Sequence, residues 1–228
     1  MDLAHDGSLS DPHSISFHRT GVGRVKDRQE KSHAHQVMPA PDEQHVYVCD
    51  LGADQIHVLA VGERANNATL KQSIKVPDGS GPRHLVFFEE MAYVVMELSL
   101  EVQAYSWDGS LLFPQGDPVQ VKPPNKRTET LAEIAVTPDG RFVYVSCRGD
   151  PEQDVLAVLP RTTPWGMPSF YPCGGRVPRH FSMSPDASWI VVANQGSETL
   201  SLLARDPNSG AVDLISSHAV GPINYAGF

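Results

Sequence analysis

The chain has little of what marks several large classes of protein. Among its 228 residues, 18 are Lys or Arg and 27 are Asp or Glu, which gives a net charge of −9. Nucleic-acid-binding proteins usually carry a basic surplus, so no nucleic-acid partner is expected. No apolar run approaches the ~20 residues of a membrane-spanning helix, so no membrane partner is expected either. The first residues, MDLAHDGSLSDPHSIS, have no basic segment followed by an apolar core, and they predict no signal peptide.

Cysteine is also scarce. The three cysteines, Cys49, Cys147 and Cys173, are widely separated and odd in number, which argues against a disulfide framework or a zinc knuckle. Cys49 and Cys147 lie in hydrophobic stretches, where a buried and unreactive thiol is the simpler interpretation. This usage suits a reducing compartment and predicts a cytoplasmic location.

No convincing amphipathic helix of three turns is found along the chain. Short alternating stretches rich in Val, Ile, Tyr and Phe occur instead, such as HVYVCD, FVYVSCR and WIVVANQ, and this pattern is typical of β-strands. Proline (19) and glycine (18) are frequent, as expected where many short strands need many turns. The fold class predicted is all-β.

A repeat of about 48 residues organises the sequence. Four segments each contain a polar cluster, a strand-like stretch, a turn and a second strand-like stretch that ends on a polar residue. Aligned on the turn, they place His35, Arg83, Ala132 and Arg179 in one frame, at steps of 48, 49 and 47 residues. A second frame holds Asp50, Glu97, Arg148 and Gln195, at steps of 47, 51 and 47. A repeat of this length built only of short strands indicates a β-propeller with one four-stranded antiparallel sheet, or blade, per repeat.

The repeat predicts one β-propeller domain over residues 1–228 with four complete blades and one strand of a fifth. The blades are expected at 31–80, 81–130, 131–177 and 178–220. Residues 1–30 would hold the last strand of a partial blade (9–17) and a connection, and 221–228 would form a tail. Expected strands are 34–39, 45–50, 55–61 and 70–76; 83–88, 91–97, 101–107 and 111–121; 132–137, 141–147, 154–160 and 167–173; and 179–184, 189–194, 199–205 and 211–219.

The two frames are expected to share one face of the molecule. In a blade the strands run antiparallel from the central channel outward, so the first strand begins where the second strand ends. Seven frame residues should therefore ring the channel mouth, namely His35, Asp50, Arg83, Glu97, Arg148, Arg179 and Gln195, with His84 and His180 one residue deeper. A concave mouth of this kind suits a small molecule, although repeat proteins also place charges at loop ends for solubility alone. A zinc site formed by His33 and His35 is not expected, since no Cys or third His falls in frame.

These positions carry a resemblance to a known family. The supporting motifs are His35 ahead of Pro41-Asp42, Gly81-Pro82-Arg83-His84, Glu97-Leu98, Pro138-Asp139-Gly140-Arg141 with Arg148, and Pro178-Arg179 with Asn194-Gln195. The chain resembles the seven-bladed propeller lactonases, of the bacterial 6-phosphogluconolactonase type and the related fungal carboxy-cis,cis-muconate lactonizing type.

The resemblance implies an active-site set of His35, Arg83, Glu97 and Arg148, with Arg179 and Gln195 as adjacent support. His84, His180 and Asp50 are assigned to substrate binding with them. The family is metal-independent, so no metal or cofactor is expected. Met96 stands where relatives of the first type carry Asn. Since the family has seven blades, the chain is expected to be an N-terminally truncated propeller whose unpaired sheet edges favour self-association.

Three functions are compatible with these residues. In a lactonase acting on a sugar-acid lactone or its phosphate, Arg83 and Arg148 would grip a phosphate or carboxylate, and Glu97 or His35 would act as general base. An arginine could also stabilise the oxyanion. The first alternative is a muconate-type lactonizing cycloisomerase. The second is a non-catalytic propeller that binds a partner, because an open arc of blades would hold only part of a site.

Overall fold

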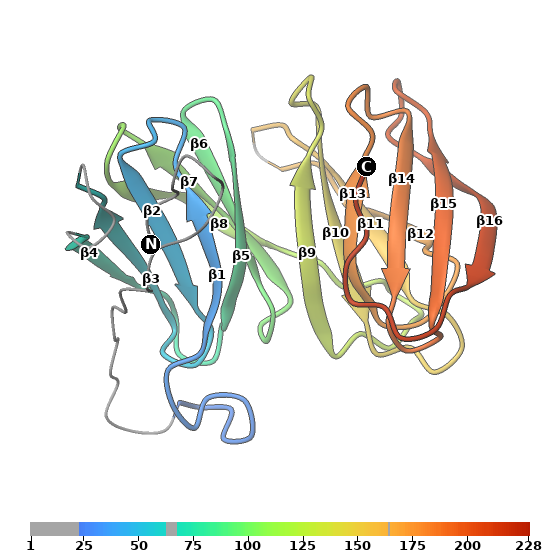
Figure 1. Ribbon diagram of the computed structural model, residues 1–228, viewed down its shortest axis with the longest axis horizontal. Coiled ribbons are helices and arrows are strands. Elements are labelled where there is room, and N and C mark those ends of the chain that lie inside the picture. The colour runs from blue at the N-terminus through green and yellow to red at the C-terminus, as the bar shows by residue number, and fades with distance from the viewer. Residues whose placement is uncertain (1–22, 63–67, 164) are drawn as a thin grey trace, which may run out of the picture.

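The computed structural model describes residues 23–62, 68–163 and 165–228. Within these ranges every regular element is a β-strand, and the sixteen strands form four separate four-stranded antiparallel sheets in chain order (Figure 1). The same part of the chain contains no helix long and apolar enough to cross a membrane. The all-β class and the four-stranded repeat are thus confirmed, while the strand expected at 9–17 lies outside the described residues.

Each sheet is a simple meander in which neighbouring strands are neighbours in sequence. The first sheet contains β1 (Ala34–Pro39), β2 (His45–Asp50), β3 (Gln55–Ala60) and β4 (Thr69–Lys75). The second contains β5 (Pro82–Phe88), β6 (Met91–Met96), β7 (Glu101–Trp107) and β8 (Leu112–Gln120). The third contains β9 (Thr130–Val136), β10 (Phe142–Arg148), β11 (Val155–Pro160) and β12 (Ser169–Pro172). The fourth contains β13 (Pro178–Met183), β14 (Trp189–Asn194), β15 (Thr199–Arg205) and β16 (Val212–Ala219).

Every predicted strand within the described residues agrees with an observed one to within two residues at each end. The largest relative difference is at β12, which was expected over 167–173 and is only four residues long. Pro168 immediately precedes it and has no N–H to donate to the ladder. Met167 is 85% exposed and takes no part in the sheet.

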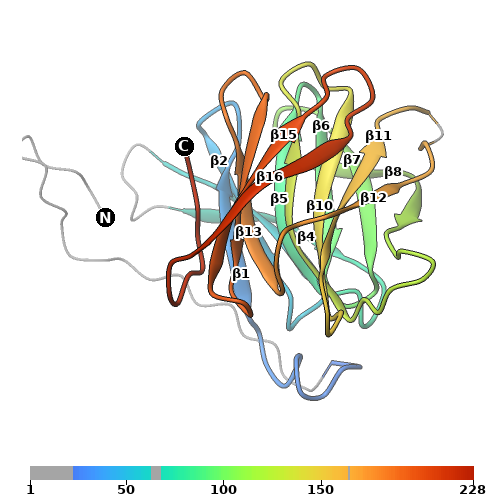
Figure 2. The ribbon, with the colours of Figure 1, turned by 90° about the vertical axis from the view of Figure 1, so that its right-hand side faces the viewer.

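The four sheets stand side by side, with their first strands in contact one after another. β1 contacts β5, β5 contacts β9, and β9 contacts β13. The last strand of each sheet lies at the outer side, as the view along the fourth sheet shows for β16 (Figure 2). After β16 the C-terminal segment returns and runs beside β13 in both views (Figures 1 and 2).

The hydrophobic core lies between the sheets, with one cluster of buried side chains between each pair of neighbouring sheets. Each cluster takes residues from two neighbouring sheets, since side chains alternate between the two faces of a strand. Ile56 of β3 and Leu85 of β5, both fully buried, belong to the cluster between the first and second sheets. Burying one such side chain stabilises the fold by about 1.5–3 kcal/mol. Similar clusters join the second sheet to the third and the third to the fourth.

A buried tyrosine at the third position of the second strand connects each of the first three sheets to the next. The Tyr47 hydroxyl donates to the carbonyl of Ser110 at 2.5 Å. Tyr93 accepts a bond from Arg161 at 3.3 Å, and Tyr144 donates to the carbonyl of Gly210. The polar ends of these side chains are therefore satisfied by the neighbouring sheet, which fixes how the sheets stack.

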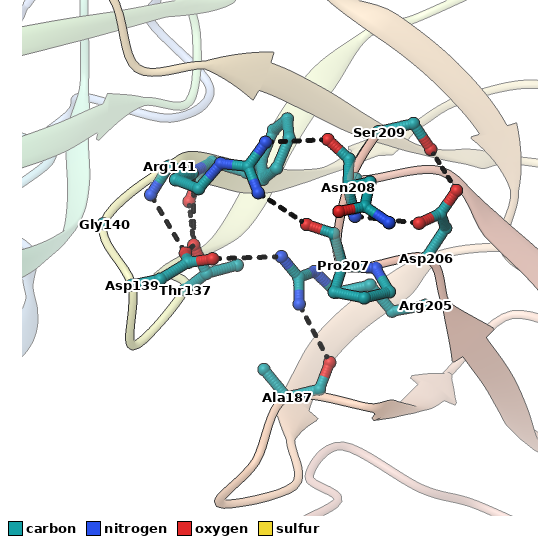
Figure 3. Close-up of polar contacts among 12 residues, drawn as sticks. Thr137, Asp139, Gly140, Arg141, Ala187, Arg205, Asp206, Pro207, Asn208 and Ser209 are labelled. Atoms are coloured by element: carbon teal, nitrogen blue, oxygen red, sulfur yellow. Dashed lines mark hydrogen bonds and ion pairs between the residues drawn. The ribbon is translucent and has the colours of Figure 1, made fainter.

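Two arginines reinforce the contact between the third and fourth sheets (Figure 3). Arg141 donates to the carbonyls of Pro207 and Asn208, at 3.0 and 2.9 Å. Arg205, which is 8% exposed, donates to the Tyr144 hydroxyl at 3.1 Å and to the carbonyl of Ala187 at 3.3 Å. We call these two side chains and their partners the inter-sheet latch.

Removing Arg205 from the inter-sheet latch is expected to destabilise the protein. Arg205→Met keeps much of the aliphatic volume but leaves the carbonyl of Ala187 without this donor, so we expect a loss of about 1–3 kcal/mol in the free energy of unfolding. Urea unfolding followed by tryptophan fluorescence measures it, with Lys71→Met on the exposed strand β4 as the control. Equal stabilities of the two variants would show that the latch adds nothing.

Candidate active site

A β-bulge recurs at the start of the first strand in the first, second and fourth sheets. The ladder register shifts between Ala34 and Gln36, between Pro82 and His84, and between Pro178 and His180. The residue skipped in each case is His35, Arg83 or Arg179. Bulges re-aim side chains and are frequent beside active sites. The frame read from the sequence is therefore a repeated feature of the backbone.

Glu97 lies at the centre of a cluster of guanidinium groups, which we call the Glu97 cluster. It directly follows β6, and 1% of it is exposed. Its Oε2 is 2.9 Å from Nε of Arg83 on β5, and its Oε1 is 3.2 Å from Nη2 of Arg148 at the end of β10. Arg28, from the segment before β1, also contacts Oε1. Three arginines from three parts of the chain therefore share one carboxylate.

The Glu97 cluster carries an excess of positive charge. One carboxylate balances one of the three guanidinium groups, so two positive charges remain. Burial lowers the pKa of Arg83 to about 10, and the neighbouring charge of Arg148 acts in the same direction while Glu97 opposes it. Arg179 is close enough to lower the pKa of both Arg83 and Arg148 further. At neutral pH these groups stay protonated, so the site favours an anion.

His35 lies beside the cluster with a free ring nitrogen. Its ring meets that of His84 edge to face, with centroids 5.0 Å apart and planes at 61°. Among the described residues, its Nδ1 has no hydrogen-bond partner although the atom is buried. Burial, and then the charge of Arg83, lower the pKa of His35 to about 3. The imidazole is therefore neutral at pH 7 and can accept a proton.

The structure also places His84 and His180 together, through a residue that the sequence interpretation missed. His84 Nδ1 is 2.8 Å from Glu133 Oε1, and His180 Nε2 is 3.3 Å from Glu133 Oε2. Glu133 follows the frame residue Ala132 just as His84 follows Arg83. The aligned repeats therefore already place Glu133 at the position of His84 and His180. The prediction did not include it, because the frame residue before it, Ala132, is apolar.

Arg28 was missed as well, because it precedes the first complete repeat and has no frame partner. Its neighbour Gln29 is fully buried and anchors this segment. Gln29 donates from Nε2 to Asp54 Oδ1 at 2.7 Å and to the carbonyl of Leu51 at 2.9 Å. The Arg28-Gln29 pair thus consists of one residue that fixes the backbone and one that reaches Glu97.

In the part of the chain that the structure describes, Asp50 and Gln195 bond to groups outside the Glu97 cluster. Asp50 accepts bonds from the N–H groups of His33 and Ala53, at 2.8 and 2.9 Å. Burial tends to raise its pKa, but bonds from His57, Ser32 and the backbone outweigh this and lower it to about 2. Gln195 is exposed, and its backbone N–H donates to the carbonyl of Val177 at 2.8 Å. A role for either residue in substrate binding stays a prediction.

The low pKa of His35 makes stability depend on pH. Its folded-state pKa lies below the ordinary value, so between pH 6.5 and about 3 the unfolded chain binds more protons than the folded one. Stability is therefore expected to fall as the pH is lowered through this window. The slope from His35 should stay below the ~1.4 kcal/mol per pH unit of one full proton, because water still screens part of the ring.

Chemical unfolding of the wild type and His35→Gln at pH 7.0, 6.0 and 5.0 tests this dependence. His180 also has a lowered pKa, from burial, and contributes in both proteins. The difference in slope between the two proteins therefore reports His35. Parallel pH profiles would contradict the assignment.

Comparison with known proteins identifies the family. A family model described as the seven-bladed β-propeller lactonases matches residues 1–224. A 6-phosphogluconolactonase of Formosa agariphila is 33% identical over 213 residues, covering 90% of this chain and 60% of the relative. One of Bacillus subtilis is 33% identical over 219 residues, covering 94% and 62%.

A solved structure adds to the likeness. The periplasmic gluconolactonase of Pseudomonas aeruginosa matches with a TM-score of 0.82 at 31% identity, over 96% of this chain and 62% of that one. The chain thus spans about three fifths of the length of these relatives. The matched range covers all four sheets and every residue of the Glu97 cluster. The chain belongs to the lactonase family of seven-bladed β-propellers.

Proposed function

We propose that the chain carries the site of a lactone hydrolase acting on a sugar-acid lactone, most closely of the 6-phosphogluconolactonase type. The observation that carries this proposal is the excess positive charge around Glu97 beside the neutral, unpartnered His35. The positive charge can bind the anionic substituent of an acidic sugar lactone. The neutral imidazole can take the proton from the water that hydrolyses the lactone. The names of the 33% identical relatives support the same substrate class.

In the proposed mechanism, Arg83 and Arg148 bind the phosphate or carboxylate, and one of these cations faces the lactone carbonyl oxygen as it becomes an oxyanion. Both oxygens of Glu97 are already in contact with arginines, so His35 is assigned as the general base. It takes a proton from water, whose oxygen then bonds to the carbonyl carbon. The bond to the ring oxygen breaks, and the imidazolium returns its proton to that oxygen.

The proposal is tested by adding 6-phosphogluconolactone to the purified chain and following acid release with a pH indicator. We expect a rate above spontaneous opening, and a loss of most of it in the double variant Arg83→Gln/Arg148→Gln. Lys71→Gln, which removes an exposed positive charge on β4, should retain the rate. Full activity of the folded double variant would overturn the mechanism.

The chain spans only about three fifths of the length of its relatives. A non-catalytic binding role is therefore the second candidate function. Calorimetric titration with 6-phosphogluconate separates the two. Binding that depends on Arg83 and Arg148 without turnover would favour a binding role and end the catalytic proposal. Self-association through open sheet edges, the cytoplasmic location, and the absence of a metal or cofactor remain predictions.

A further inference from the structure

A buried carboxylate that the proposed mechanism does not use lies among the innermost strands of three successive sheets. Glu133 is on β9 and is 7% exposed. Its Oε1 is 2.8 Å from Nδ1 of His84 on β5, and its Oε2 is 3.3 Å from Nε2 of His180 on β13. Two imidazoles from opposite neighbouring sheets therefore converge on one acidic side chain.

The partners of His84 determine where its proton lies. An ionised carboxylate only accepts hydrogen bonds, and a guanidinium only donates them. Because His84 Nδ1 faces Glu133 and its Nε2 is 3.1 Å from Nη1 of Arg83, the proton must be on Nδ1. The neutral ring then donates to Glu133 and accepts from Arg83.

The same reasoning gives His180 the opposite tautomer. Its Nε2 faces Glu133, and its Nδ1 is 3.5 Å from the backbone N–H of Ala226, which can only donate. The proton is therefore on Nε2. The ring of Tyr225 packs on this imidazole with centroids 4.1 Å apart, so the C-terminal segment is tied to the same network.

Arg83 is held along two edges by this arrangement. Its Nε faces Glu97 Oε2 at 2.9 Å while its Nη1 donates to His84 at 3.1 Å. A guanidinium fixed at two points has a defined plane, and a binding group is useful in catalysis only if its orientation is fixed. Burial is the largest influence on the pKa of Glu133 and works to raise it, but the interactions with His84 and His180 and the bond from the Ile134 backbone together lower it, so the carboxylate stays ionised at neutral pH.

We propose that Glu133 is a positioning residue of this site, which sets the tautomers of His84 and His180 and, through His84, the orientation of the Arg83 guanidinium. The effect on hydrolysis rests on the proposed function, but the effect on the two imidazoles does not. A purely structural Glu133 would stabilise the fold without controlling either ring.

The decisive measurement is nitrogen-15 NMR of the imidazoles, assigned with His84→Gln and His180→Gln variants. In the wild type at pH 7 we expect the proton on Nδ1 in His84 and on Nε2 in His180. In Glu133→Gln the side-chain oxygen can accept from only one of the two imidazoles, and the NH2 group faces the other as a donor. At least one ring should therefore change tautomer. The opposite wild-type pattern would overturn the proposal even if the variant failed to fold.

Kinetics with 6-phosphogluconolactone provides the second readout. Misplacing a substrate-positioning group by about 1 Å can cost about 10²-fold in rate, so kcat/KM of Glu133→Gln should fall by at least about tenfold. Glu133→Asp keeps an acceptor and should recover part of the loss, and Asp213→Asn on exposed β16 should change nothing. If the wild type were inactive while the tautomers responded, only the proposed function would fail. If the wild type were active and neither kinetics nor tautomers responded, the positioning role would fail.

Discussion

Replacing Glu97 with Gln is expected to destabilise the protein by about 3–5 kcal/mol, the largest loss of stability among the substitutions considered. The change keeps the size of the side chain but removes the charge that Arg83 and Arg148 share. Arg83 is 2% exposed and Arg148 is 9% exposed, so neither can turn to water for compensation. Removing one partner of a buried ion pair costs this much because the remaining charge is buried and unpaired.

Equilibrium unfolding in urea measures the effect, with Glu90→Gln as the matched control. Glu90 is exposed in the turn before β6, so the same chemical change there should alter stability by less than about 0.5 kcal/mol. A loss below about 1 kcal/mol in Glu97→Gln would mean that water or rearrangement screens the arginines. The description of the Glu97 cluster as buried would then be wrong.

The fold was predictable because its signals are local and repeated. Alternation in HVYVCD and FVYVSCR, together with turns such as Pro138-Asp139-Gly140, fixes both the strand bounds and the repeat. The side chain of Asp139 shows why the turn is specific, since its Oδ1 accepts from the N–H of Arg141 at 3.0 Å. The equivalent turns of the first and fourth sheets make the same bond, from Gln44 to Asp42 and from Ser188 to Asp186, so weak patterns in several repeats reinforce one another.

The candidate site was predictable only in part, because a frame locates a backbone position and not the direction of a side chain. Asp50 and Glu97 occupy equivalent positions, yet Asp50 accepts bonds from backbone N–H groups of its own loop region while Glu97 faces the arginines. Buried N–H groups must find acceptors, and a short aspartate meets that need locally. Such competition between local and long-range partners is decided by packing, which one sequence does not reveal.

The Glu97 cluster also illustrates why net charge is a poor guide to a site. The whole chain carries −9, but Arg28, Arg83 and Arg148 outnumber the single carboxylate that they share. Burial strengthens the local field, because the interior has a lower effective dielectric constant than water. An acidic protein can therefore present a basic site to an acidic substrate.

The second large effect is expected in catalysis. Replacing His35 with Gln should lower kcat for 6-phosphogluconolactone by about 10²- to 10⁴-fold, the usual contribution of a general base. KM should change little, since the arginines that we propose to bind the anion remain. His218→Gln, on exposed β16, is the control. A folded His35→Gln protein with a normal kcat would leave the reaction without its assigned base.

The positive charges that lower the pKa of His35 in the free protein can be offset by a bound anion, which would make His35 a stronger base when substrate is present. Burial comes first, but Arg83, His84, Arg179 and Arg148 all lower this pKa from about 6.5 to about 3. An anion bound among these arginines offsets their charge, so the pKa of His35 should rise on binding, toward the range where proton transfer is efficient. NMR titration of the His35 imidazole with and without 6-phosphogluconate measures this shift. A pKa that stays near 3 in the saturated complex would argue against His35 as the base, because the bound anion would then not raise the proton affinity of the imidazole.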